Sequence, residues 1–420
     1  MATDIWIDDT YYAGADGAMV KNSWIQMTEE SSGKEPGWYY LGSSGKAEKD
    51  GWKTIGDYKY CFDDNGKMHT GWYFEDDNIY YLGDENDGAM KTGWRCLEYD
   101  EDEQPEEGDI SPSCSTAGES AKWFYFQTSG KAKKAESGNY ASVTVDNKKY
   151  YFDENGVMAA GWVAVNEAKA GDSTGITKFV YLGDENDGTM AKGQWKYLTE
   201  HPGDSDDSSE ISGADSDDGP QEGDGEWYYF QSSGVPAYLD TTADTMSEAT
   251  TKVSGTSYFF DGYGCMNTGL IRIGTSGGDL TGYFGPESGD GKMRTGRQTG
   301  VSEDGGDSYT YYFASSGSNK GAGYSGTQDG YLYYNGRMVK ADDDTDYQVF
   351  EVNDKLYLVS ESGKVQTSSK SYKVNGDYRY KITGGTIYFI DDDQDVTGEV
   401  GSGEAETLPV ITYDKEYDLG

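Results

Sequence analysis

The chain of 420 residues has few aliphatic side chains and no long apolar run. Only 35% of its residues are hydrophobic, so the large aliphatic core of an ordinary multidomain protein is not available. No segment is apolar for long enough to span a bilayer, and we expect no membrane insertion. Low aliphatic content with high charge is typical of disordered chains, but those are poor in aromatics. Here 14% of residues are aromatic, which indicates a folded protein.

Basic side chains are also scarce. Lysine and arginine number 34 against 76 aspartate and glutamate residues, which gives a formal net charge of −42. A nucleic-acid-binding protein neutralises phosphates with basic side chains, so this charge argues against nucleic acid as a partner. The same field repels anionic membranes and phosphate-rich polymers, leaves neutral polysaccharide unaffected and attracts cations. We therefore expect a neutral or cationic ligand.

Histidine is nearly absent, and no catalytic constellation is recognisable. His69 lies between a turn and a strand and His201 begins an acidic loop, so neither is placed like a catalytic base. The many carboxylates give no reason to choose any pair as a glycosidase dyad. Residues 83–88 and 183–188 are rich in oxygen ligands but lack the full calcium-binding loop with its closing glutamate. We expect acidic hairpin turns there, no catalytic residues, no metal and no cofactor.

The four cysteines form no C-x-x-C pair, so neither a metal site nor a redox motif is indicated. Cys96 and Cys114 flank an acidic stretch and could close it as a disulfide, which would suit an extracytoplasmic protein. Free cysteines are the alternative for this pair. Cys61 lies in a strand-like run, where a small buried hydrophobic residue is the ordinary role.

What the sequence has in abundance is a three-part cassette that returns four times. Each cassette has a Gly-x-Met turn, an aromatic run that ends in Ser-Gly, and a second Gly-x-Met turn. The first turns end at Met19, Met90, Met190 and Met293; the aromatic runs begin at Trp38, Trp123, Trp227 and, in weaker form, Tyr311; the second turns end at Met68, Met158, Met266 and Met338. Regular recurrence of this kind is the signature of a repeat array.

Most parts of the cassette are predicted β-hairpins. Residues 58–68 give the pattern clearly: an aromatic strand, then an Asp-Asn-Gly turn, then a short second strand. One hairpin is marginally stable alone, so consecutive hairpins must stack and bury aromatic faces. The predicted fold is all-β, an elongated β-solenoid of stacked β-hairpin repeats.

The array is predicted to span residues 1–344, with acidic insertions at about 98–120 and 199–225. These insertions are rich in Asp, Glu, Ser, Gly and Pro, and we expect loops or locally disordered segments. A shorter insertion occurs at the same place in the first cassette, from about Thr28 to Pro36. Residues 345–420 are predicted to be degenerate repeats or a β-rich C-terminal cap.

The motifs resemble a known superfamily. Thr-Gly-Trp follows a Gly-x-Met turn at residues 70–72 and 92–94, with Tyr-Tyr-Leu or Tyr-Tyr-Phe in the preceding strand. This combination, over roughly residues 10–340, resembles the cell-wall-binding repeats of bacterial surface proteins, which include choline-binding modules and glucan-binding repeats. The resemblance implies binding sites between consecutive hairpins, where an aromatic residue at the end of one meets an aromatic residue at the start of the next.

Carried over copy by copy, the resemblance implies a ligand-binding set of nine tryptophans. It pairs Trp24 with Trp38, Trp94 with Trp123, and Trp195 with Trp227; Trp52, Trp72 and Trp162 either complete sites or pack the core. In the fourth copy the partners would be Arg297 and Tyr311, which departs from the pattern. Packing could account for any single tryptophan. It does not explain why tryptophan ends after Trp227 while the repeat continues.

Two ligand classes suit paired aromatics. A pyranose ring lays its apolar face on an indole, whereas a choline group is held by cation–π attraction among three aromatic rings. Choline is displayed on polyanionic teichoic acid, which this acidic chain would repel, so the sequence favours neutral polysaccharide. We expect a non-catalytic, multivalent carbohydrate-binding protein for α-glucan such as starch or maltooligosaccharides. The alternatives are a choline and teichoic-acid cell-wall module, and a structural surface spacer.

Several weak sites on one chain would raise avidity for a polymer that presents repeated ligands. We expect a monomeric part of a larger surface protein, secreted or held at the bacterial cell surface, although no signal peptide is recognisable at the N-terminus.

Overall fold

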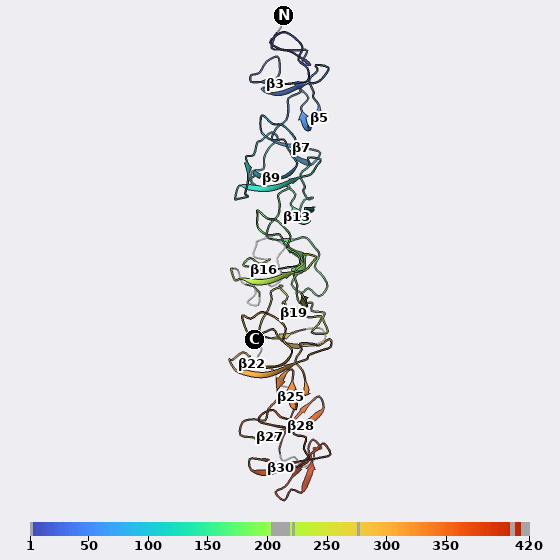
Figure 1. Ribbon diagram of the computed structural model, residues 1–420, viewed down its shortest axis with the longest axis vertical. Helices are drawn as coiled ribbons and strands as arrows, with labels where there is room; N and C mark the ends of the chain where they lie inside the picture. The colour runs from blue at the N-terminus through green and yellow to red at the C-terminus, as the bar shows by residue number, and fades with distance from the viewer. Residues whose placement is uncertain (1–2, 203–218, 221–222, 275–277, 404–407, 413–420) are drawn as a thin grey trace. The chain divides into compact units, whose positions relative to one another are not determined.

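The computed structural model describes residues 3–202, 219–220, 223–274, 278–403 and 408–412 (Figure 1). The chain divides into two compact units. The first comprises residues 1–165 and 180–191, and the second comprises residues 166–179 and 192–420. The predicted boundary near residue 345 stays a prediction.

Short antiparallel hairpins make up the first unit. Its strands are β1 (Ile5–Ile7), β2 (Tyr11–Ala13), β3 (Ser23–Met27), β4 (Gly37–Leu41), β5 (Gly51–Ile55), β6 (Tyr58–Phe62), β7 (Trp72–Glu75), β8 (Asn78–Tyr81), β9 (Gly93–Glu98), β10 (Ser113–Cys114), β11 (Ala121–Phe126), β12 (Ala141–Val145), β13 (Lys148–Phe152), β14 (Trp162–Ala164) and β15 (Phe179–Tyr181).

The second unit begins with the same pattern and then changes it. Its elements are η1 (Ile176–Lys178), β16 (Gln194–Leu198), β17 (Glu226–Phe230), β18 (Thr251–Val253), β19 (Thr256–Tyr258), β20 (Leu270–Ile273), β21 (Leu280–Tyr283), β22 (Gly296–Ser302), β23 (Ser308–Phe313), β24 (Gly326–Gln328), β25 (Tyr331–Tyr334), β26 (Arg337–Met338), β27 (Tyr347–Val352), β28 (Lys355–Ser360), β29 (Ser371–Val374), β30 (Asp377–Thr383), β31 (Thr386–Ile390), β32 (Val396–Glu399) and β33 (Val410–Thr412).

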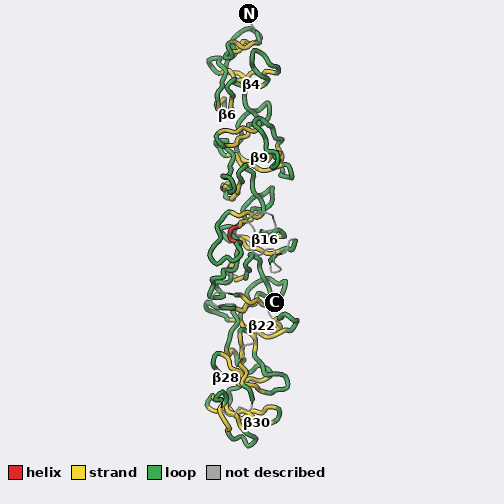
Figure 2. Tube along the Cα trace, turned by 180° about the vertical axis from the view of Figure 1, so that it is seen from behind, coloured by secondary structure: helices red, strands yellow, loops and turns green. Residues whose placement is uncertain are grey.

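Larger sheets replace simple hairpins toward the C-terminus. Strands β22 to β26 form one five-stranded sheet, and β29 to β32 form a four-stranded one. Strand β33 pairs parallel to β27. Figure 2 shows strands and loops throughout the described residues, with η1 as the short helical turn. The predicted all-β, hairpin-stacking fold class is confirmed.

Each cassette contains three hairpins, which we name by their order. The lead hairpins are β1–β2, β7–β8, β14–β15 and β20–β21; the pair hairpins, which carry the paired tryptophans, are β3–β4, β9–β11 and β16–β17; the follower hairpins are β5–β6, β12–β13 and β18–β19. Their cores are mainly aromatic. The largest fully buried side chains include Trp72, Tyr39, Phe124 and Phe152.

A backbone hydrogen bond links each follower hairpin to the pair hairpin before it. The amide of Met68, at the end of the follower turn, donates to the carbonyl of Trp38 in the pair hairpin at 2.8 Å. The same link recurs from Met158 to Trp123 and from Met266 to Trp227, both at 2.8 Å. Because these amides belong to turn residues, the Gly-x-Met motif is the connector of the array.

The glycine of the next turn fits against the connecting methionine. A Cβ on Gly88 would lie 2.2 Å from the Sδ of Met68, and Gly88 has φ +61°. Gly188 meets Met158 and Gly291 meets Met266 in the same way. Glycine is needed here for both the left-handed backbone and the close approach.

The acidic insertion at residues 98–120 is mainly loop, as expected, but it is tied to the hairpin that carries it. Its strand β10 pairs with β9, and Cys96 and Cys114 form a disulfide. Part of the insertion covers the lead hairpin, because the amide of Trp72 donates to the carbonyl of Asp109 at 2.9 Å. Most of the second insertion, residues 203–218 and 221–222, lies outside the described residues.

Replacing Gly88 by alanine is expected to lower the free energy of unfolding more than the same change at Gly56. Both residues have positive φ, which costs an alanine about 1–2 kcal/mol. Only Gly88 also has a methionine within reach of a Cβ, since nothing lies within 4 Å of Gly56. Urea unfolding of both variants measures the difference, and equal losses would refute the role of the Met68 contact.

Candidate ligand-binding site

The first tryptophan pair lies within one hairpin and forms two walls of a surface cavity. Trp24 on β3 pairs in register with Tyr40 on β4, two residues after Trp38. The indoles of Trp24 and Trp38 are 6.4 Å apart and nearly perpendicular, at 85°. The next hairpin supplies a third ring, because Tyr60 lies 4.8 Å from Trp24 at 64°. Three steeply inclined aromatic faces therefore meet around one space.

Met68 and two polar residues complete this space. A cavity of about 290 Å³ is lined by Trp24, Trp38, Tyr60, Met68, Asn86 and Asp87. The indole N–H of Trp38 donates to Oδ1 of Asn86 at 3.3 Å, which fixes the orientation of the ring. We call the three rings and the methionine cage 1.

The same arrangement recurs twice in the described residues. Cage 2 consists of Trp94, Trp123, Tyr150 and Met158; cage 3 consists of Trp195, Trp227, Tyr258 and Met266. The two indoles are 6.3 Å apart at 82° in cage 2 and 6.4 Å apart at 82° in cage 3. The tyrosine lies 4.7 Å from the first indole in cage 2 and 5.0 Å in cage 3.

The geometry corrects one expectation and adds residues that the sequence analysis missed. The paired tryptophans come from the two strands of one hairpin, not from consecutive hairpins, because the insertion between them is that hairpin's own loop. The following hairpin contributes the tyrosine and the methionine instead. Tyr60, Tyr150 and Tyr258 each stand two residues before a phenylalanine, a spacing that could have identified them.

Trp52 has a cage-like position that the protein fills itself. Lys59 stands where a pair hairpin has its second tryptophan, and the perpendicular ring comes from Tyr73, 5.7 Å away at 84°. The indole N–H of Trp52 donates to the carboxylate of Glu75 at 3.1 Å. Trp52 is half-buried in these contacts and lies outside the three cages.

Trp72 is a core residue, which corrects its place in the predicted ligand-binding set. Its side chain is 1% exposed, because the insertion at 98–120 folds over it and Ser111 accepts its indole N–H at 2.8 Å. Trp6, which the sequence analysis did not single out, is buried in the same lead position. Trp162 also belongs to a lead hairpin and lies edge-on to Tyr181 at 5.4 Å.

A lysine covers Trp6 from the short insertion of the first pair hairpin. The ammonium of Lys34 lies 5.0 Å from the Trp6 ring and 5.7 Å from the Tyr39 ring. Burial lowers the pKa of Lys34. Aromatic faces in this fold thus accept a cation taken out of water.

The fourth copy lacks both tryptophans, and an arginine occupies the first position. Arg297 pairs in register with Tyr312, as Trp24 pairs with Tyr40. Thr310, two residues before Tyr312, therefore has the second position, and Tyr311 is a fully buried core residue rather than the expected partner. The guanidinium of Arg297 lies 4.8 Å from the ring of Tyr331.

The turn before cage 3 contains a carboxyl group with a shifted pKa. Oδ1 of Asp261 accepts the amides of Tyr263 and Cys265 at 2.9 and 3.0 Å, which shapes the turn that leads to Met266. Burial raises the pKa of Asp261 to about 6, although these hydrogen bonds oppose the shift.

His201 and the acidic turns make contacts within the protein. The ring of His201 is buried between the hydroxyl of Tyr228 at 2.7 Å and the carbonyl of Asp224 at 2.9 Å. In the turn at 83–88, Asp84 accepts the amide of Asn86 at 3.0 Å. Within the described ranges, no group of three or more His, Cys, Asp or Glu side chains is placed to hold a metal. None of the helices described there is long and apolar enough to cross a bilayer.

Replacing Asp261 by asparagine is expected to change how stability depends on pH. The pKa of Asp261 in the folded protein, about 6, exceeds the value of about 3.9 for an unfolded aspartate. Its stabilising contribution is therefore complete below about pH 4 and is lost as the pH rises through about 6. Urea unfolding at intervals from pH 4 to pH 7 should show the native protein losing stability relative to the variant. A constant difference over this range would contradict the assignment.

Comparison with protein families identifies repeats in both units. A model described as a choline-binding repeat matches residues 49–94, and a second with the same description matches residues 1–28. A model described as a putative cell wall binding repeat matches residues 36–47, 143–158 and 221–235. No match was found among the curated proteins.

Solved structures with similar features include two proteins of Streptococcus pneumoniae. Choline binding protein F is 23% identical, with a TM-score of 0.39 over 84% of this chain and 99% of its own. The modular autolysin LytC is 16% identical, with a TM-score of 0.24 over 94% of this chain and 53% of its own. An alternansucrase in complex with isomaltononaose is 20% identical, with a TM-score of 0.22 over 72% of this chain and 18% of its own.

Proposed function

We propose that this chain, which belongs to the cell-wall-binding repeat superfamily, is a non-catalytic, multivalent binding protein whose cages hold quaternary ammonium groups. The ligand class is that of the choline groups displayed on a bacterial cell wall, and the chain acts at the cell surface. This proposal takes the alternative of the sequence analysis in place of α-glucan.

The shape of the cages is the observation that carries the proposal. In each cage the two indoles meet at 82° to 85°, and a tyrosine closes a third side. A pyranose ring needs a flat platform, whereas a trimethylammonium group presents apolar, positively polarised surface in every direction. Three inclined faces therefore suit a compact cation better than a sugar ring.

Charge supports the same ligand. The carboxylate-bearing Asp87 lines the cavity of cage 1, and the chain has a formal net charge of −42. The net negative charge attracts a cation and gives a neutral sugar nothing. The carboxylate of Asp87 is already ion-paired with Lys91, so it adds less to this attraction than the net charge does. The phosphates of teichoic acid are repelled at long range, so the head group itself must supply the attraction.

The fourth copy gives independent support. Tyr331 stands in the position of Tyr60, and the side chain placed over its ring is the cation Arg297. In the copy that lacks the paired tryptophans, a positively charged side chain of the protein itself thus lies over the tyrosine that recurs in every copy. We infer that the corresponding space in the three cages is suited to a cation.

Neutral α-glucan is the second candidate, because cage 3 extends into an open aromatic surface. Tyr197 lies 5.3 Å from Trp227, and the two side chains are 57% and 45% exposed. Adjacent exposed rings of this kind offer a platform for successive sugars. A structural spacer is the third candidate and predicts binding to neither ligand.

Removing the first tryptophan of each cage is expected to remove one choline site at a time. In calorimetric titrations with choline, Trp24→Ala, Trp94→Ala and Trp195→Ala should each lower the stoichiometry by one, because each change opens one cage. Trp52→Phe is the control, since Trp52 lies outside the cages and should leave the stoichiometry unchanged.

The same variants distinguish the three candidate functions. Native electrophoresis through gels with starch or dextran tests the glucan reading in parallel. Retardation by starch without a choline response would establish α-glucan as the ligand and overturn the proposal. Absence of both choline binding and retardation by glucan would favour the structural spacer.

A fourth choline site is expected when the tryptophan pair is restored in the last copy. The double substitution Arg297→Trp and Thr310→Trp removes the internal cation and supplies both indoles beside Tyr331. Calorimetry should then give a stoichiometry one higher than that of the native chain. A folded variant with the native stoichiometry would show that these positions do not define the cage.

A further inference from the structure

The three cages differ at the residue that faces the second tryptophan across the hairpin. The facing pairs are Gln26 and Trp38, Cys96 and Trp123, and Tyr197 and Trp227. In cage 1, Gln26 donates to Oδ1 of Asn86 at 3.4 Å and thus contacts the residue that lines the cavity. The residue that faces the second tryptophan therefore borders the cage, and the three cages have different side chains at this border.

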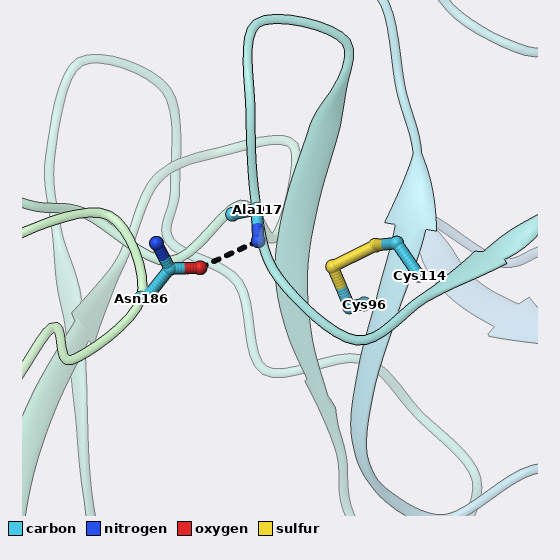
Figure 3. Close-up of a disulfide and its surroundings, with 4 residues drawn as sticks. All are labelled: Cys96, Cys114, Ala117 and Asn186. Atoms are coloured by element: carbon cyan, nitrogen blue, oxygen red, sulfur yellow. Dashed lines mark hydrogen bonds between the residues drawn. A yellow bond between two sulfur atoms is a disulfide. The ribbon is translucent and has the colours of Figure 1, made fainter.

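In cage 2 the facing residue is half of a disulfide. Cys96 is bonded to Cys114, and the chain then turns back toward Trp123 through a segment that we call the strap, residues 114–119 (Figure 3). Cys96, Ala117 and Ala121 form a small buried cluster, with Cys114 and Trp123 packed against it. The disulfide thus holds Ala117, the one buried residue of an otherwise exposed and mainly polar strap, against the second tryptophan.

The strap also reaches the asparagine at the rim of the cage. The amide of Ala117 donates to Oδ1 of Asn186 at 2.5 Å, as Figure 3 shows. Asn186 occupies the position in its turn that Asn86 has in cage 1. The strap therefore lies at the side of cage 2 where cage 1 has its lining asparagine.

The asparagine at the rim accepts from different donors in the two cages. In cage 1 the indole N–H of Trp38 donates to Asn86. In cage 2 the matching indole N–H of Trp123 is buried and, among the residues that the structure describes, has no hydrogen-bond partner. In cage 2 it is the strap amide of Ala117, and not the indole, that donates to the asparagine. A buried indole N–H without a partner is unfavourable.

We propose that Ala117 of the strap and the Cys96–Cys114 disulfide form a fourth, apolar wall of cage 2, and that this wall makes cage 2 a tighter site for a compact quaternary ammonium ion than cage 1. This inference rests on the proposed function. Its physical basis is desolvation: an apolar wall excludes water from the ligand space, and cation–π attraction strengthens when the cation is desolvated.

The experiment isolates cage 2 in the full chain and removes the strap's anchor. Trp24→Ala with Trp195→Ala disables cages 1 and 3, and choline binding is then followed by tryptophan fluorescence before and after treatment with dithiothreitol. Reduction breaks the Sγ–Sγ bond and leaves two protein thiols, while the dithiol becomes a cyclic disulfide. Cys61 and Cys265 are unpaired and buried, so this disulfide is the target in the described chain.

We expect reduction to weaken choline binding by cage 2 about fivefold, because the released strap lets water into the cage. Cys96→Ser with Cys114→Ser, and separately Asn186→Ala, should weaken it similarly, the latter without touching the disulfide. The matched control is Trp94→Ala with Trp195→Ala, which retains cage 1. Cage 1 has no cysteine, so its affinity should not respond to dithiothreitol.

Equal or tighter binding by reduced cage 2 would overturn the inference while leaving the proposed function intact, provided that cage 1 binds choline. If neither cage binds choline, the proposed function fails, and the strap is judged by hydrogen exchange alone. The amide of Ala117 should be protected in the oxidised chain and should exchange faster after reduction. Unchanged exchange of Ala117 would refute the strap itself.

Discussion

The array depends on one recurring backbone hydrogen bond, from the methionine amide of a Gly-x-Met turn to a carbonyl in the preceding hairpin, as from Met68 to Trp38. Two-stranded hairpins are marginal in isolation, and this chain has too few aliphatic residues to give each a core. The link brings consecutive aromatic faces together, so that Phe62 comes against Trp24, with ring centroids 5.9 Å apart. The same step places Met68 and Tyr60 beside the tryptophan pair. Stacking and cage formation are therefore one structural event.

Sequence periodicity was sufficient for the fold class and for the three tryptophan pairs. The pairs recur at fixed places in the cassette, and local turn chemistry predicts the hairpins. The tyrosine and methionine of each cage were not predicted as ligand residues. Their role depends on the contact between consecutive hairpins, and a repeat pattern gives the order of hairpins without the register of their stacking.

The burial of Trp72 and the alignment of the fourth copy could not be predicted from the sequence. The burial of Trp72 depends on an acidic insertion whose composition is typical of a solvated loop. The insertion is held over the indole by hydrogen bonds from Trp72 to the backbone of Asp109 and to the side chain of Ser111. The fourth copy was misaligned by one residue because Thr310 stands where the other copies have tryptophan, so the aromatic run begins at Tyr311 instead. Tyr311 looked like the second cage residue, and Thr310 has that position.

The methionine that connects two hairpins also lines the ligand space of cage 1, and this has a mechanical consequence. A ligand in the cage touches two successive hairpins, so the loaded state is more stable than the empty one against any motion that separates them. If the chain holds a cell wall as proposed, shear on the cell would pull along the chain. Under such tension the ligand in each occupied cage would hold two successive hairpins together. Binding to the wall would then stiffen the part of the chain that carries the force.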